Sequence, residues 1–297
     1  MPLKLLQETD FLPLLFSDQQ VEFLIKSGEA CMSQPNVIDA ERYFTTALSN
    51  INSQSRFYNY LLYRRAESLY YQSKYELAEE VLNNIISTRC SASFGAQVLA
   101  SKGRVRFRAC KYVEAETALI LALESTSLPE QQKVESLIFL GRIKLDKKEY
   151  FQAMQCSDEV LQSSNLCPMM RIKAIHISSL AKYGLAKYEE AERGFSSLLE
   201  GKLNSFVRIG ILLNRAKIYR LYGYFAAAER DYQQVSTYKT SPYMIGITLY
   251  WSGRMADLQG EFADAENFNQ RLASRNYDMI LAGQSLGYNL DIYSYWH

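Results

Sequence analysis

Histidine is almost absent from this chain: only His176 and His297 occur among 297 residues. Histidine supplies many of the zinc and haem ligands of proteins and most of their proton transfers near neutral pH. With two histidines, this chain has few residues for a zinc site, a haem site or a proton relay. The five cysteines are scattered and contain no C-x-x-C pair, which argues against both a disulfide framework and a zinc knuckle. We therefore expect no metal and no cofactor, in a protein of the reducing cytoplasm.

An excess of one charge and a long apolar run are also missing. Lys and Arg number 33 and Asp and Glu number 32, so the net charge of +1 gives no general attraction to nucleic acid or acidic lipid. No uninterrupted apolar run reaches the roughly 18 residues of a membrane-spanning helix. The apolar amino-terminal stretch contains Glu8, Asp10 and Pro13 and lacks a small-residue cleavage site, which makes a signal peptide the weaker alternative. We expect no nucleic acid and no membrane among the partners.

The chain has only 6 prolines and 14 glycines, too few to separate many short strands, so the composition favours a helical protein. The chain in fact repeats itself. An alanine, usually followed by glutamate and preceded three residues earlier by an aromatic residue, recurs every 37 or 38 residues. These anchor alanines are Ala40, Ala78, Ala115, Ala153, Ala191, Ala228 and Ala265. A spacing this regular defines seven repeats, numbered here from one to seven.

A second small residue stands twelve positions before every anchor, as at Gly28, Gly103 and Ser179. Two small residues at a fixed separation indicate two helices that approach closely at one point. We expect first helices near 18–33, 56–73, 92–109, 129–147, 168–185, 205–222 and 242–259. We expect second helices near 37–50, 75–87, 112–124, 150–163, 188–200, 225–237 and 262–274.

In these features residues 20–274 resemble the tetratricopeptide repeat (TPR) family, in seven degenerate copies. Two departures stand out, because the period exceeds the family's usual 34 residues and leucine or isoleucine replaces the tryptophan of the first helix. The resemblance implies an all-α, right-handed superhelical solenoid of antiparallel helix pairs over residues 18–274. Residues 1–17 would then form an amino-terminal cap or strap and residues 275–297 a capping helix or tail. The alternative for the second end is a partner-binding surface around Tyr293 and Trp296.

One catalytic-looking motif is present near the carboxyl end. Residues 283–287 read G-x-S-x-G, and Asp291 and His297 follow in the order used by α/β hydrolases. The nucleophile of that motif stands between a buried strand and a helix of a parallel sheet, and the upstream chain has no alternation of strands and helices. We therefore predict that the protein is not an enzyme.

The resemblance also implies which residues line the concave groove: the one just after the small residue, with those four before and three after it. These positions carry aromatic and basic side chains among apolar ones, which suits a peptide or helix with apolar anchors and some carboxylates. The alternative for each of these side chains is that it only faces solvent on the surface of its helix. For His176 a purely structural role is favoured over a role in binding. The candidate partner-binding residues are Tyr63, Tyr70, Arg104, Phe107, Arg142, His176, Tyr183, Lys217, Arg220, Tyr250 and Arg254.

Members of the family that bind the acidic tails of chaperones carry asparagine where this chain has Glu29 and Glu67, so that activity is not transferred. The interpretation is a non-catalytic scaffold or adaptor that binds a partner peptide or helix in the groove. The alternative is a regulator whose superhelix changes when a short peptide binds. Residues 101–250 carry 22 basic and 15 acidic side chains, a net charge of +7, which could attract an acidic partner or the acidic end of a second copy. We expect Arg104 and Arg142 to meet such acidic groups, with no role for their charge in the fold.

Overall fold

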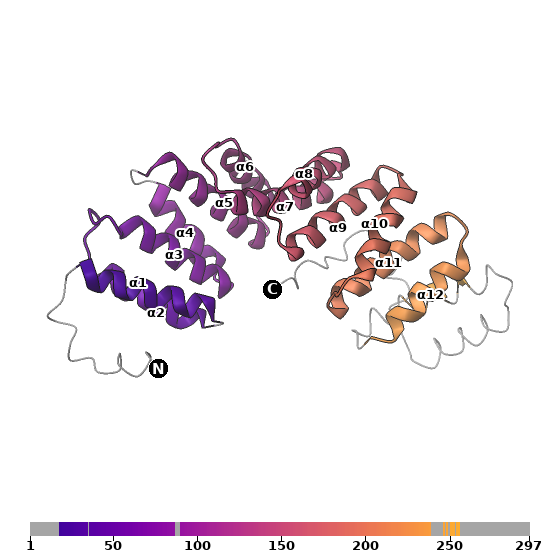
Figure 1. Ribbon diagram of the computed structural model, residues 1–297, viewed down its shortest axis with the longest axis horizontal. Helices are drawn as coiled ribbons and strands as arrows, with labels where there is room; N and C mark the ends of the chain where they lie inside the picture. Colours follow the sequence, from indigo (N-terminus) through magenta and orange to yellow (C-terminus); the bar gives the residue numbers. More distant parts are fainter. Residues whose placement is uncertain are drawn as a thin grey trace. The chain divides into compact units, whose positions relative to one another are not determined.

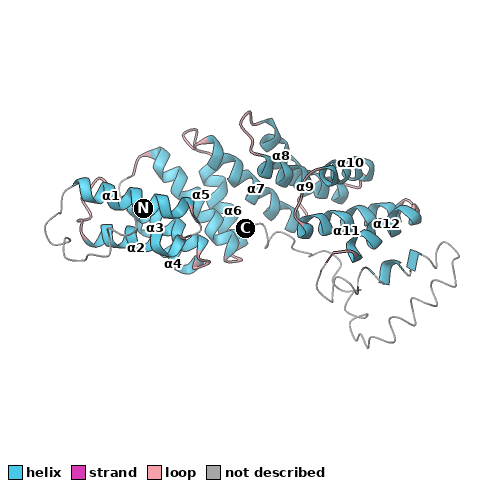
Figure 2. Cartoon of the chain, turned by 60° about the horizontal axis from the view of Figure 1, so that its bottom comes forward, coloured by secondary structure: helices cyan, strands magenta, loops and turns pink. Residues whose placement is uncertain are grey.

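The computed structural model describes residues 18–34, 36–86 and 90–238, together with residues 246, 248, 250–252, 254 and 255. Every regular element within these ranges is a helix and none is a strand (Figure 2). No helix there is long and apolar enough to cross a membrane. Most of the expected seventh helix pair, both chain ends and the G-x-S-x-G motif lie outside the described residues.

Twelve helices follow one another in the described part of the chain, in antiparallel pairs (Figure 1). Each begins and ends within two residues of the bounds expected from the sequence, which confirms the all-helical fold class and the register of the first six repeats. The helices are α1 (Asp18–Ser33), α2 (Val37–Ser49), α3 (Tyr58–Tyr71), α4 (Tyr75–Ile86), α5 (Ala92–Arg108), α6 (Tyr112–Leu123), α7 (Glu130–Asp146), α8 (Tyr150–Gln162), α9 (Pro168–Gly184), α10 (Tyr188–Glu200), α11 (Ser205–Leu221) and α12 (Phe225–Ser236).

The chain divides into two compact units, Met1–Ile143 and Lys144–His297. In unit 1, consecutive helices from α1 to α6 pack against one another, and in unit 2 consecutive helices from α8 to α12 do the same. The core of each unit therefore runs continuously from one helix pair to its neighbours, so that no pair buries its apolar stripe alone.

The small residues hold the two helices of a pair together, as the sequence indicated. A Cβ atom added at Gly103 would lie 2.6 Å from the side chain of Leu119 and 3.2 Å from the carbonyl oxygen of Ala115. In repeat one, the same addition at Gly28 would lie 2.5 Å from Phe44. The described anchor alanines are fully buried. A side chain larger than the native one at either position would force the helices apart.

The turn between the two helices of a pair has one backbone conformation in five repeats. The residue five positions before the anchor has a positive φ of 59° to 74°. After α5 the N–H groups of Cys110 and Lys111 donate back to the carbonyls of Phe107 and Arg106, at 3.1 and 2.9 Å. This is the Schellman ending of a helix, and it sets the direction of the second helix in the same way each time. The five residues are Ser73, Cys110, Lys148, Ala186 and Gly223.

Candidate partner-binding site

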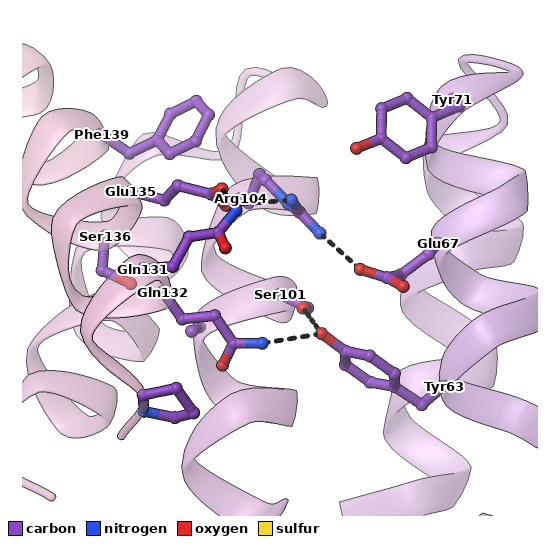
Figure 3. Close-up of a pocket in the computed structure, with 12 residues that line it drawn as sticks. Tyr63, Glu67, Tyr71, Ser101, Arg104, Gln131, Gln132, Glu135, Ser136 and Phe139 are labelled. Atoms are coloured by element: carbon purple, nitrogen blue, oxygen red, sulfur yellow. Dashed lines mark hydrogen bonds and ion pairs between the residues drawn. The ribbon is translucent and has the colours of Figure 1, made fainter. Parts of the chain in front are cut away.

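The five candidate residues of unit 1 come together on its first helices α3, α5 and α7. Tyr63 and Arg104 line an open pocket of about 240 Å³ among these helices (Figure 3). The guanidinium of Arg104 lies over the ring of Tyr70, 4.7 Å from its centroid, and that of Arg142 lies 5.3 Å from the centroid of Phe107. Aromatic rings therefore support both arginines, each ring reaching the arginine of the next repeat.

Arg104 is held between two carboxylates of its own chain. Its Nη2 atom lies 3.4 Å from Glu67 Oε1 and its Nη1 atom 3.2 Å from Glu135 Oε2, and only 13% of its side chain is exposed (Figure 3). Burial alone would lower the pKa of Arg104, but Glu135 and Glu67 outweigh this effect and raise it. The expectation that the fold makes no use of this charge needs correction, because two largely buried carboxylates depend on it.

These contacts belong to a longer row of alternating charges, which we call the charge ladder. Arg64 continues it, because its guanidinium pairs with Glu67 and its Nε atom lies 3.9 Å from Glu29 Oε1. With three carboxylates and two guanidiniums, the charge ladder carries a net charge of −1. Its members are Glu29, Arg64, Glu67, Arg104 and Glu135.

Two polar atoms of the pocket residues are buried without a hydrogen-bond partner: the acceptor Oε1 of Gln132 and the donor Nε of Arg104. The amide nitrogen of Gln132 is used, because it donates to the hydroxyl of Tyr63 at 3.2 Å, as does Ser101 Oγ, also at 3.2 Å. Burial raises the pKa of Tyr63 to about 12, so its hydroxyl is neutral. Tyr71 also lines the pocket and is 55% exposed.

Several lining residues were missing from the sequence prediction. The positions considered there stand 15, 11 and 8 residues before the anchor, whereas Gln132, Glu135, Ser101 and Tyr71 stand 21, 18, 14 and 7 residues before theirs. Glu135 lies one turn before the inner stripe and Gln132 almost two turns before it, whereas Ser101 and Tyr71 each follow an inner position by one residue. Extending the stripe by two turns towards the start of the helix, and widening it by one residue, would have found them.

The candidate residues of unit 2 have different surroundings. His176 is 1% exposed and its ring meets that of Phe195 edge-on, with centroids 6.0 Å apart, so it forms part of the core. Tyr183 packs against Tyr188. Of the two candidates beyond α12, Tyr250 packs against Trp251 and Arg254 is exposed.

Lys217 and Arg220 lie on α11, three residues apart. Lys217 Nζ donates to Asn214 Oδ1 at 3.3 Å, and the guanidinium of Arg220 lies 3.3 Å from the centroid of the Trp251 ring. Neither cation is paired with a carboxylate in the described part of unit 2. Burial lowers the pKa of Lys217, and the charge of Arg220 lowers it further.

No family model and no curated protein matches this sequence. Among solved structures, a tetratricopeptide repeat protein from Parabacteroides merdae is similar with 17% identity and a TM-score of 0.58, over 90% of this chain and 97% of that one. The apo form of RapI has 14% identity and a TM-score of 0.66, over 87% of this chain and 77% of its own. A Rap protein complexed with competence and sporulation factor has 13% identity and a TM-score of 0.57, over 85% and 75% of the two chains. The helix pairs therefore form a TPR-like α-solenoid, a fold typical of protein–protein interaction.

Proposed function

We propose that the protein is a non-catalytic scaffold or adaptor that binds an extended segment of a partner protein in the pocket among α3, α5 and α7. The observation that carries this proposal is the pair of unpartnered polar atoms, Gln132 Oε1 and Arg104 Nε. One is an acceptor and the other a donor, and a peptide bond supplies one N–H and one C=O group. Both atoms are covered in the free protein, so a bound main chain satisfies them once the side chains of Gln132 and Arg104 turn towards it. Each atom costs about 1–3 kcal/mol while it stays buried and unpaired.

The rest of the pocket suits an apolar side chain of the same segment. Tyr71 and Phe139 both line it, and Tyr71 keeps more than half of its surface exposed in the free protein. Covering an exposed aromatic ring is a frequent source of binding energy. The charge ladder has a net charge of −1, so a carboxylate gains nothing in this pocket. We therefore expect an acidic side chain of the partner to bind outside this pocket.

The test is selection of a displayed library of random twelve-residue peptides on the full-length protein. Enriched peptides, synthesised with a fluorescent label, should bind the wild type and lose about tenfold or more in affinity to a Tyr71→Ala, Gln132→Ala variant, as expected for a binding hot spot. Leu77→Ala is the matched control, because Leu77 is also half-exposed but lies on a second helix, α4, and is not among the residues that line the pocket.

Both variants should keep the melting temperature of the wild type, since neither changes a core residue. Failure to enrich any peptide would contradict the proposal. An equal loss of affinity in the pocket variant and in Leu77→Ala would also contradict it, because binding would then not depend on the pocket. The proposal includes a cytoplasmic location, which the five free cysteines support.

A second candidate function is a regulator whose shape responds to a short peptide. The similar Rap structures support it, because one is complexed with competence and sporulation factor. Small-angle scattering separates the two functions. A scaffold keeps its radius of gyration when an enriched peptide is added, whereas a regulator contracts. Sedimentation at several concentrations tests the remaining alternative, in which the acidic partner is a second copy of the chain.

A further inference from the structure

Lys217 and Arg220 occupy the positions of repeat six that Arg104 and Phe107 occupy in repeat three, 11 and 8 residues before the anchor. In repeat three the cation is enclosed by two carboxylates. In repeat six two cations lie on one helix face, and no described carboxylate pairs with either. The same position is therefore neutralised by carboxylates of the chain in unit 1, whereas in unit 2 it has no carboxylate partner among the described residues.

Lys217 is poorly compensated where it lies. Its recorded hydrogen bond goes to a neutral amide oxygen, that of Asn214, at 3.3 Å. The nearest ion pair on the same helix belongs to Arg215, which binds both carboxylate oxygens of Asp231 at 2.8 and 2.6 Å and uses the charge of that acid. A partly buried ammonium that has no counterion among the residues the structure describes is stabilised by any anion that reaches it.

Arg220 lies beside Lys217 on the same helix. Stacking on Trp251 covers one face of its guanidinium plane, and the guanidinium also hydrogen-bonds the side chain of Tyr232, which leaves the remaining N–H groups along the edges of the plane. Guanidinium edges match the two oxygens of a carboxylate. Residues three apart on a helix are neighbours, with Cβ atoms about 5–6 Å apart, so one carboxylate can meet both cations.

We propose that Lys217 and Arg220 form a receptor for a carboxylate, namely an aspartate or glutamate side chain of the partner. The inference rests on the proposed function and deepens it, because it assigns the acidic group of the partner to unit 2. The pocket of unit 1 and the pair on α11 are separate contacts, and only the pair on α11 takes a charge.

The first experiment uses acetylated tetraglutamate amide as the probe and tetraglutamine as its neutral counterpart, both titrated into the full chain at low ionic strength. The wild type should bind tetraglutamate at least about tenfold more tightly than a Lys217→Gln, Arg220→Gln variant, the ratio expected for a charge-assisted contact. A variant with Arg42→Gln and Arg193→Gln has the same net charge as the test variant and loses two exposed cations elsewhere. It should bind like the wild type.

Equal weakening in the two double variants would overturn the inference, because binding would then follow net charge alone. Tetraglutamate binding no stronger than that of tetraglutamine would overturn it as well. These outcomes are distinct from failure of the proposed function, which is judged by peptide enrichment and by the Tyr71→Ala, Gln132→Ala variant.

A second, independent measurement repeats the selection of peptides on the Tyr71→Ala, Gln132→Ala variant, so that binding does not depend on the pocket of unit 1. Peptides enriched there should contain aspartate or glutamate more often than the starting library does, and replacing that residue by its amide should cost about tenfold in affinity. The same replacement should cost little when Lys217→Gln and Arg220→Gln are added, because the receptor is then already gone. Enriched peptides without an acidic residue would contradict the carboxylate receptor.

Discussion

The first helices of the two units share one backbone design and differ in how the charges of their inner residues are compensated. Arg104 in unit 1 and Lys217 in unit 2 stand at the same distance from their anchors on corresponding first helices. Arg104 is closed between Glu67 and Glu135, whereas Lys217 contacts a neutral amide. A repeat therefore fixes where a side chain lies, while neighbouring side chains decide whether its charge is available to a partner.

The largest expected effect tests whether the two units really share one design. Ala115 and Ala191 are both fully buried anchors, so arginine at either position overpacks the helix pair and buries an unpaired charge. We expect Ala115→Arg and Ala191→Arg each to cost about 3 kcal/mol or more in the free energy of unfolding, measured with urea. Thr117→Arg is the control and should cost little, because α10 already carries Arg193 at the corresponding position. A large cost in only one unit would break the comparison.

The next prediction addresses the compensation of charge directly. Arg104→Met leaves Glu67 and Glu135 facing each other largely buried, and we expect a loss of about 3 kcal/mol in the free energy of unfolding. Lys217→Met removes a poorly compensated cation and keeps an unbranched side chain, so it should cost nothing or stabilise the protein. Denaturation of both variants at pH 7 provides the measurement. If Lys217→Met costs as much as Arg104→Met, then Lys217 is compensated after all.

The extent to which the sequence predicts these features depends on how local each feature is. The helix pairs follow from anchors such as Ala115 and small residues such as Gly103, because their period is unbroken. The charge ladder could not be predicted, since Arg104 meets carboxylates 37 residues before it and 31 residues after it, on two other helices. Glu135 in addition stands one helical turn before the inner positions that the resemblance implied. The role of the predicted site residues in partner binding stays a prediction.

The backbone conformation of the turns is also only partly predictable from the sequence. Only Gly223 carries the residue that a positive φ favours, whereas Cys110 and Ala186 adopt it with a Cβ atom present. We expect Cys110→Gly in unit 1 and Ala186→Gly in unit 2 each to raise the free energy of unfolding by about 1 kcal/mol, and Gly223→Ala to lower it by a similar amount. Thermal denaturation would measure all three. A destabilised Ala186→Gly would mean that its turn differs from the turn at Gly223.

The smallest effect concerns the pH dependence of stability and sharpens the comparison at Lys217. Burial and then Arg220 lower the pKa of this amine in the folded protein, whereas in the unfolded chain it has the ordinary value of about 10.4. Between these two pKa values the unfolded state binds more protons than the native state, so the contribution of Lys217 to stability rises with pH. Below the folded pKa the amine is charged in both states and its contribution is at its least favourable.

The measurement is the difference in unfolding free energy between the wild type and Lys217→Met, followed from pH 7 to about pH 10. Tyrosines that ionise at high pH, such as Tyr63, are present in both proteins and cancel in this difference. The wild type should gain on the variant as the pH rises. Saturating tetraglutamate should flatten the rise, because a bound carboxylate raises the pKa of Lys217 towards its ordinary value. A difference that falls with pH would mean that the amine already has an anionic partner in the free protein, and that α11 offers no unoccupied charge to a ligand.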